Sequence, residues 1–394
     1  MENAMTNVIG LARVQEMISG DKYARAKELK SQGKLVFGYV CCFVPLEMLT
    51  ALDVVPIRML GDSNEPQTEA DKHVENIMCS FIRSVFDIDL KGRFSFLDGL
   101  VVPHSCDSVC MTWGLWPYYN KRPFQYFLNV PHLVNEAGEE LMAEALRQFK
   151  VRLEQYTGKT LTDDALRKEI TLHNKQRALL RQLYEYRKEN GPRITGSEVK
   201  NSLIAVMSLP VEEGNELLHE ILAELDARPA RRAKGPRILV YGPAMDNDFI
   251  ELVEECGAEV VVDDACLGTR FFMSDVNEKE EPYRALNWRY LAKSKCPRTY
   301  KRPAEDKLEF KKTYDYDEDI ELRLGHILDY AKGWQADGAI MYVIRFCDSH
   351  GFDIPDVRDY LRKNDVPVLV LEGDYTLAKE QLKTRIQAFL EMLE

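Results

Sequence analysis

Basic residues are scarce in this sequence. Its 394 residues include 52 Lys and Arg against 64 Asp and Glu, which gives a formal net charge of −12 with neutral histidines. The phosphates of a nucleic acid repel such an excess of acidic side chains. We therefore expect a protein that does not bind nucleic acid.

Long hydrophobic runs are also missing. The longest apolar interval extends from about Val36 to Leu46, which is well short of the roughly 18 residues that a membrane-spanning helix needs. The first residues, Met1-Glu2-Asn3-Ala4, do not begin a basic region followed by an apolar one, as a secretory signal does. We predict a cytoplasmic protein without a membrane segment.

Nucleotide-binding and hydrolase motifs are lacking as well. Gly158-Lys159-Thr160 matches the end of a phosphate-binding loop, but Leu153 stands where that loop needs its first glycine. No Gly-x-Gly-x-x-Gly follows an expected strand, and no Gly-x-Ser-x-Gly occurs. The sequence therefore contains neither a recognisable nucleotide cradle nor a serine-hydrolase motif.

Cysteine is well represented, but without any Cys-x-x-Cys pair. An odd number of cysteines in a reducing compartment is not expected to form structural disulfides. Two interpretations remain, because free cysteines are either buried as small apolar residues or act as metal ligands. The nine cysteines are residues 41, 42, 79, 106, 110, 256, 266, 296 and 347.

Short apolar runs predict the fold. Most of them are continuous rather than alternating, which is typical of strands buried on both faces of a parallel sheet. We predict an α/β protein with two parallel-sheet domains, residues 1–134 and 235–394, joined by a charged helical region, residues 135–234. The expected strands are Leu35–Val40, Val54–Met59, Leu97–Val102, Tyr126–Val130, Arg237–Tyr241, Glu259–Val262, Ile340–Ile344 and Pro367–Leu371.

Cysteines recur where four of these strands end. They are Cys41 with Cys42, Cys106, Cys266 and Cys347. Ligands of open parallel sheets bind at the carboxyl ends of the strands, and thiolates suit zinc or iron–sulfur clusters. This placement favours a metal centre that the fold assembles from distant parts of the chain.

Other residues near these strand ends have two interpretations each. His104 and His350 lie beside strand-end cysteines, where a histidine is either a hydrogen-bonded loop residue or a proton donor. Cys110 can share a helical face with Cys106, although its neighbours Met111 and Trp113 are equally typical of core packing.

The motifs at these strand ends, in their order along the chain, resemble the benzoyl-CoA reductase and 2-hydroxyacyl-CoA dehydratase family. The similarity is greatest to the smaller, cluster-carrying subunits of that family. The matching segments are Gly38–Glu47 with Val55–Arg58, Cys79-Ser80, Ser105–Asp107, Asp263–Arg270, Cys296–Arg298, Phe346–Asp348, Leu371–Tyr375 and Leu382–Ile386.

The resemblance implies a cofactor and partners. It implies two flavodoxin-like domains and a [4Fe-4S] cluster held by three cysteines, by position Cys79, Cys106 and Cys347. Three protein ligands leave one iron open to a further ligand. The resemblance also implies a related or identical second subunit, a separate ATP-hydrolysing activator that donates low-potential electrons, and radical chemistry on an acyl-CoA substrate.

Within this family, the sequence slightly favours benzoyl-CoA-type ring reduction over 2-hydroxyacyl-CoA dehydration. The preference rests on the aromatic-rich stretch Trp113–Phe127 after Cys106, which forms either core or the wall of an apolar slot. Glu47, in the Pro-x-Glu segment near a strand end, is the candidate catalytic acid or base. A surface or helix-capping role for Glu47 is the alternative.

Two features depart from the pattern of these subunits. Cys110 stands where the family often has a basic residue, and Cys41, Cys266 and Cys296 resemble positions of the double-cubane cluster proteins, relatives that reduce small molecules. A double-cubane-type reductase is therefore one alternative function. A non-catalytic electron-transfer subunit is the other.

We predict that the purified chain does not hydrolyse ATP by itself, because Leu153 interrupts the one partial phosphate loop. A phosphate-release assay on the chain alone, compared with the chain plus its activator, checks this. Sustained ATP hydrolysis by the chain alone would contradict it.

Overall fold

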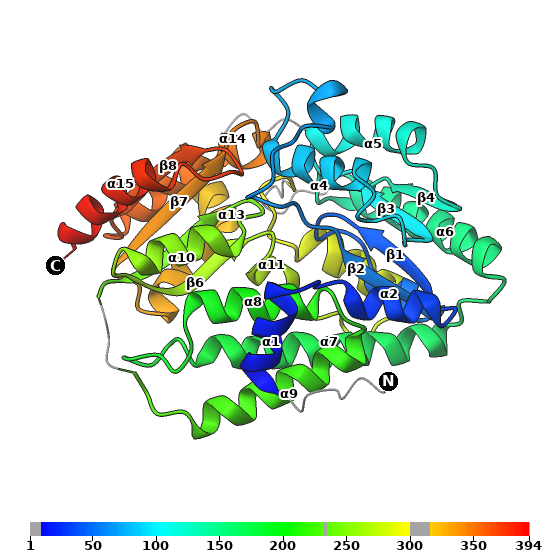
Figure 1. The fold of residues 1–394 in the computed structure, drawn as a ribbon, viewed down its shortest axis with the longest axis horizontal. Helices are drawn as coiled ribbons and strands as arrows, with labels where there is room; N and C mark the ends of the chain where they lie inside the picture. Colours follow the sequence, from blue (N-terminus) through cyan, green and yellow to red (C-terminus); the bar gives the residue numbers. More distant parts are fainter. Residues whose placement is uncertain (1–8, 232–234, 300–315, 394) are drawn as a thin grey trace.

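The computed structural model describes residues 9–231, 235–299 and 316–393, and within them the strands form two four-stranded, all-parallel sheets (Figure 1). The N-terminal sheet has the order β2-β1-β3-β4, and the C-terminal sheet has the order β6-β5-β7-β8. The strands are β1 Leu35–Tyr39, β2 Val54–Arg58, β3 Gly99–Pro103, β4 Phe124–Leu128, β5 Arg237–Gly242, β6 Glu259–Ala265, β7 Gly338–Ile344 and β8 Val368–Gly373.

Both sheets share the strand order of a flavodoxin-like domain, in which the first strand lies between the second and the third. The second strand is therefore added on one side of the first strand, and the third strand on its other side. The strand order reverses between β1 and β3 in the N-terminal sheet, and between β5 and β7 in the C-terminal sheet. Ligands bind at such a switch point, outside the carboxyl ends of the strands. The predicted α/β class is confirmed.

Helices cover the faces of the sheets. Those around the N-terminal sheet are α2 Ala24–Ser31, α3 Leu46–Thr50, η1 Ala70–Lys72, α4 Ser80–Leu90 and α5 Asp107–Tyr119, whereas α1 Gly10–Ser19 packs on the helical segment between the sheets. Those in the C-terminal half are α10 Asn247–Glu255, α11 Thr269–Phe272, α12 Pro282–Asn287, η2 Trp288–Ala292, α13 Tyr316–Gly333, α14 Asp348–Lys363 and α15 Lys379–Glu391. In the described residues, no helix is both long and apolar enough to cross a membrane.

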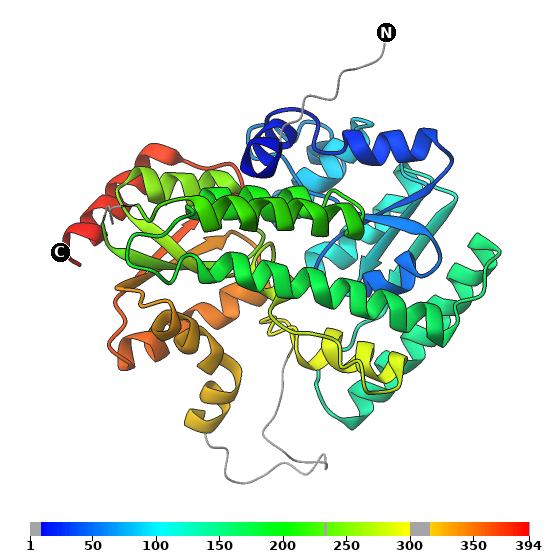
Figure 2. The same cartoon turned by 90° about the horizontal axis from the view of Figure 1, so that it is seen from below.

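Four helices fill the segment between the sheets: α6 Glu136–Thr157, α7 Asp163–Glu185, α8 Gly196–Val206 and α9 Val211–Ala227. Thr162 caps α7 by accepting a hydrogen bond from the Ala165 amide at 3.2 Å, as its sequence indicates. Figure 2 shows α7, α8 and α9 running beneath both sheets. The boundaries of the three predicted regions stay a prediction.

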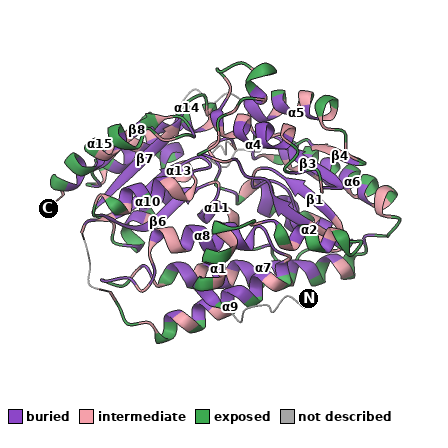
Figure 3. Ribbon diagram, viewed as in Figure 1, coloured by how far each residue is buried: buried purple, intermediate pink, exposed green. Residues whose placement is uncertain are grey.

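A continuous apolar core joins the two halves. Buried side chains of β1, α4, β5 and β7 pack in one cluster, and Figure 3 shows the central strands of both sheets buried. The Phe81 and Tyr375 rings meet at 5.2 Å between centroids, and the Tyr375 amide donates to the Ser80 hydroxyl at 2.8 Å. The N-terminal end of α4 is therefore fixed against the residues that follow β8 of the C-terminal sheet.

The aromatic stretch after Cys106 contributes to this core. The Trp116 side chain is fully buried, its indole N–H donates to Asp89 Oδ2 at 2.6 Å, and its ring meets the Phe86 ring edge-on. Trp116 therefore does not wall an open slot. Trp113 is half-buried and stacks on Phe127 with 5.7 Å between centroids, so these two rings are the remaining slot candidates.

We predict that Trp116→Ala lowers the free energy of unfolding by about 3 to 5 kcal/mol, because it leaves a cavity and removes one of the two hydrogen-bond donors to Asp89, the other being Arg122. Denaturant unfolding at neutral pH measures the loss. Tyr118→Ala on the same helix is the control, since Tyr118 is 75% exposed and should change stability by about 0.5 kcal/mol or less. Equal effects of the two substitutions would contradict the core assignment.

Candidate functional site

Three cysteines occupy equivalent positions, each directly before the first residue of a helix. Cys79 precedes α4, Cys106 precedes α5 and Cys347 precedes α14. Cys106 and Cys347 also follow β3 and β7, the third strand of each sheet. The N-terminal end of a helix favours negative charge, so the helix end works toward a thiolate at each position.

These residues, called here the first cysteine group, meet across the two halves of the chain. The Cys347 thiol donates a hydrogen bond to the Cys79 sulfur, and the charge of Cys79 acts on both Cys106 and Cys347. Cys79 is buried, while Cys106 and Cys347 are half-buried. The structure thus brings together the three residues that the sequence singled out.

Protonation of the first cysteine group follows from these contacts. The hydrogen bond from Cys347 lowers the pKa of Cys79, whereas that same bond, together with burial, raises the pKa of Cys347 well above its ordinary value. Burial raises the pKa of Cys106. A metal centre would replace these thiol protons, because thiols bind metals in their deprotonated form.

Three thiols form a donor set that suits an iron–sulfur cluster. Within the described part of the chain, no three His, Cys, Asp or Glu side chains converge closely enough to hold one metal ion. A cluster of four irons holds its thiolates farther apart than a single ion does, and thiolates are its usual ligands. The roles of Cys79, Cys106 and Cys347 as ligands stay a prediction.

A second cysteine group lies nearby and consists of Cys41, Cys42, Cys266 and Cys296. The Cys41 thiol donates to Cys42, and Cys42 donates to Cys296, which raises the pKa of Cys42 to about 12. Cys266 acts electrostatically on Cys41 and Cys42. The sequence analysis named Cys41, Cys266 and Cys296 as possible additional ligands but did not include Cys42, which connects Cys41 to Cys296. The only indication in the sequence was that Cys42 is adjacent to Cys41.

The two cysteine groups adjoin one another. Cys41 interacts electrostatically with Cys106, and Cys266 does so with Cys347. The buried Arg298 guanidinium acts on thiols of both groups. Its positive charge favours thiolates on either side.

A buried ion pair lies next to the second cysteine group. Arg270 binds both carboxylate oxygens of Asp264 at 3.0 Å, and both side chains are 1% exposed. His326 Nε2 lies 3.2 Å from Asp264 Oδ2. Burial works against ionisation of Asp264, but Arg270 and His326 hold the pKa of this carboxyl well below its usual range.

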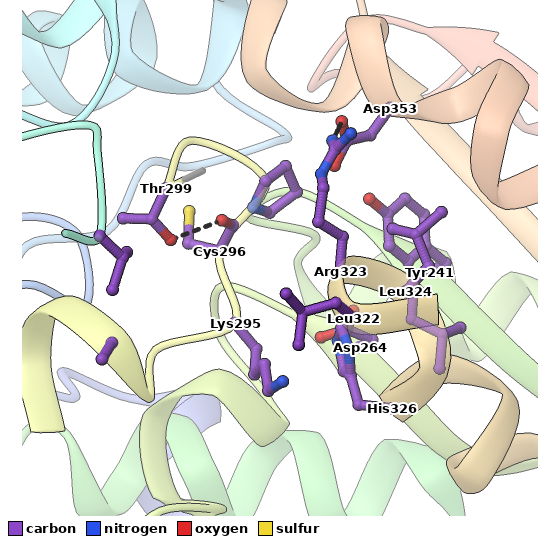
Figure 4. Close-up of a pocket in the computed structure, with 14 residues that line it drawn as sticks. Tyr241, Asp264, Lys295, Cys296, Thr299, Leu322, Arg323, Leu324, His326 and Asp353 are labelled. Atoms are coloured by element: carbon purple, nitrogen blue, oxygen red, sulfur yellow. Dashed lines mark hydrogen bonds and ion pairs between the residues drawn. The ribbon is translucent and has the colours of Figure 1, made fainter. Parts of the chain in front are cut away.

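A pocket opens between this ion pair and Cys296 (Figure 4). In Figure 4, Cys296 and Thr299 lie on one side of the pocket, while Tyr241, Asp264 and His326 lie on the other. Arg323 from α13 pairs with Asp353 from α14 at the rim. The pocket thus offers ionised and hydrogen-bonding groups beside a cysteine.

Comparison with known proteins identifies the family of this chain. A family model described as 2-hydroxyglutaryl-CoA dehydratase, D-component, matches residues 41–393, a span that includes all nine cysteines. The chain belongs to this family. The resemblance seen in the sequence motifs is thereby confirmed.

Curated relatives of the D-component family are enzyme subunits of similar length. One of the subunits of benzoyl-CoA reductase from Thauera aromatica is 24% identical over 366 residues, covering 91% of each chain. The beta subunit of (R)-2-hydroxyglutaryl-CoA dehydratase from Acidaminococcus fermentans is 25% identical, covering 96% of this chain and 97% of the relative. The (R)-phenyllactyl-CoA dehydratase beta subunit of Clostridium sporogenes is 23% identical with the same coverage.

Glu47, the candidate acid or base of this D-component chain, lies in a fully buried ion pair. Its Oε1 accepts from Arg177 at 2.5 Å and its Oε2 from Tyr290 at 2.8 Å. Burial favours the neutral acid, but Arg177 and His173 outweigh it and lower the pKa of Glu47 to about 2. Such a carboxylate is ionised at neutral pH and ties α3 to α7 and η2.

We predict that Glu47→Gln lowers the free energy of unfolding by about 3 to 5 kcal/mol at pH 7, because Arg177 then keeps a buried, uncompensated charge. The folded-state pKa of about 2 lies below the ordinary 4.5. The stabilisation is therefore complete above about pH 4.5, and the difference between wild type and variant should shrink as the pH falls toward 2.

Denaturant unfolding at several pH values measures this difference. Asp53→Asn is the control, since its ion pair with Lys159 is exposed and should be worth about 1 kcal/mol or less. A Glu47→Gln variant with unchanged stability and lost turnover would contradict the structural role and support catalysis.

Proposed function

We propose that the chain is the iron–sulfur subunit of an enzyme of the benzoyl-CoA reductase and 2-hydroxyacyl-CoA dehydratase type. It would use low-potential electrons for radical reduction, or dehydration, of a CoA thioester. The observation that supports this most is the first cysteine group, in which three thiols at three helix N-termini meet between the two sheets. Cys79, Cys106 and Cys347 would hold the [4Fe-4S] cluster.

The cluster, when bound by three protein thiolates, supplies one-electron chemistry and an iron site open to a substrate oxygen. The chain's own residues would prepare its surroundings. The N-termini of α4, α5 and α14 stabilise negative charge on the sulfurs. Cys79 is buried, and the Phe81 and Tyr375 rings pack edge to face close to it.

The proposal includes partners. The names of the relatives describe subunits of a reductase and of dehydratases, which supports a second subunit, related or identical to this chain. The interrupted phosphate loop at Leu153 is consistent with a separate ATP-hydrolysing activator as electron donor. All nine cysteines lie in described residues as free thiols, which suits a reducing, oxygen-free cytoplasm.

The relatives do not decide between ring reduction and dehydration, because they include both kinds of enzyme at 23% to 25% identity. Trp116 is buried in the core and cannot line an aromatic slot, whereas the half-buried pair of Trp113 and Phe127 can still do so. We therefore propose the reaction class, reduction or dehydration of a CoA thioester, without ranking the two.

A second candidate function is a double-cubane-type reductase of small molecules. The specific observation in its favour is the second cysteine group, whose members Cys41, Cys42 and Cys296 form a hydrogen-bonded series. It adjoins the first cysteine group through Cys41 and Cys266. A larger cluster would draw ligands from both groups.

We predict that Cys79→Ala, Cys106→Ala and Cys347→Ala each lose most of their iron, because each removes one of three thiolate ligands. Iron and acid-labile sulfide are measured after anaerobic purification. The control is Cys256→Ala, since Cys256 is half-buried like Cys106 but contacts the Lys383 carbonyl away from both groups.

The same measurement separates the two candidate functions. Iron lost from the Cys41→Ala and Cys296→Ala variants but retained in all three variants of the first cysteine group would overturn the proposal. That result would favour the double-cubane function. Equal iron loss from the Cys256→Ala control would mean that the losses report general damage to the fold.

A further inference from the structure

His350 uses both of its ring nitrogens, one of them in a contact with the first cysteine group. It lies in the first turn of α14, three residues after Cys347, and is 2% exposed. Its Nδ1 is 3.4 Å from Cys347 Sγ. Its Nε2 is 2.7 Å from Arg270 Nη1.

Arg270 determines which nitrogen of His350 carries the proton. A guanidinium has five N–H donors, no acceptor, and a permanent positive charge. His350 Nε2 must therefore accept the hydrogen bond with its lone pair, which makes the ring neutral and puts the proton on Nδ1. The Nδ1–H group then points at Cys347 Sγ and donates to it.

The position of Arg270 is itself fixed. Asp264 binds the guanidinium through both carboxylate oxygens. The Gly242 carbonyl, which also lies beside His350, accepts from Arg270 Nη1 at 3.4 Å. A bidentate pair that is almost completely buried leaves the guanidinium little freedom. Because Arg270 does not release a proton, this series of contacts does not conduct protons from the pocket; it orients one N–H group.

The other sulfurs of the first cysteine group receive backbone donors. Cys79 accepts from the amides of Phe81 and Ile82, and Cys106 accepts from the amide of Val109. These are the free N–H groups of a helix N-terminus. At Cys347, a side chain supplies the donor, so this hydrogen bond can be removed by substitution without changing the backbone.

We propose that His350 is a positioning residue whose Nδ1–H, oriented by Arg270, donates a hydrogen bond to the Cys347 sulfur and raises the reduction potential of the cluster. The inference rests on the proposed function, because it takes Cys347 as a cluster ligand. Hydrogen bonds to ligating sulfurs stabilise the more negative, reduced state and so set the potential. His350 thereby makes electron acceptance from the donor easier.

Two substitutions separate the hydrogen bond from the bulk of the side chain. His350→Asn keeps an amide N–H where Nδ1 stands, whereas His350→Leu fills similar space without a donor. His326→Asn is the control, since the hydrogen-bonding partner of His326 is Asp264 Oδ2 rather than a sulfur of the first cysteine group. If the leucine variant does not fold, His350→Gln replaces it. The longer glutamine side chain places its amide near the position of Nε2, beside Arg270, and leaves no donor at the position of Nδ1.

The first measurement is nitrogen NMR of the imidazoles in the iron-free chain under reducing conditions. The neutral His350 ring should carry its proton on Nδ1. The second is an anaerobic redox titration of the cluster-loaded chain, followed by EPR. At a fixed solution potential, the ratio of reduced to oxidised cluster should fall about tenfold in His350→Leu, which is about 59 mV for a one-electron couple. His350→Asn and His326→Asn should match wild type.

Failure of this inference and failure of the proposed function give different results. A proton on Nε2 in the iron-free chain, directed at the Gly242 carbonyl, or a wild-type potential in a cluster-loaded His350→Leu variant, would overturn the role of His350. An equal shift of the reduction potential in His326→Asn would also overturn it, because the shift would then come from a general change in the electrostatics around the cluster rather than from the hydrogen bond to Cys347. A wild-type chain that takes up no iron would refute the proposed function, while the NMR result still decides whether the hydrogen bond exists.

Discussion

The site depends on one constraint, namely that all strands of a parallel sheet end at the same edge. This chain has two such sheets, and the contacts of Cys79 with Cys347 and of Ser80 with Tyr375 hold their strand ends against each other. Cysteines far apart in sequence are therefore neighbours in space. A site built this way requires both halves of the chain, which explains why an apolar core runs from one half into the other.

Buried ion pairs position the residues around this edge. Arg270 with Asp264 lies behind the second cysteine group, and Arg177 with Glu47 joins the helical layer to α3. Buried charges add little net stability, but removing one partner is costly, so each pair holds its elements in one arrangement. In the first pair the result is an oriented imidazole at Cys347.

Local sequence predicts much of the fold and part of the site. Continuous apolar runs predicted each strand of both sheets to within a few residues, because such runs have few alternatives in an α/β chain. Strand-end cysteines pointed to the right edge of the sheets. The partners of Glu47 and His350 were out of reach, since Arg177 and Arg270 lie 130 and 80 positions away and no local pattern links them. The burial of Trp116 likewise depends on Asp89 and Phe86 from another helix.

In the proposed function, the first cysteine group holds the iron. Anomalous scattering at the iron absorption edge, from crystals grown without oxygen, tests it most directly because it locates iron in the folded chain. We expect one compact iron peak bounded by the sulfurs of Cys79, Cys106 and Cys347. A peak centred on Cys41, Cys266 and Cys296, or crystals of active protein with no iron between the sheets, would contradict it.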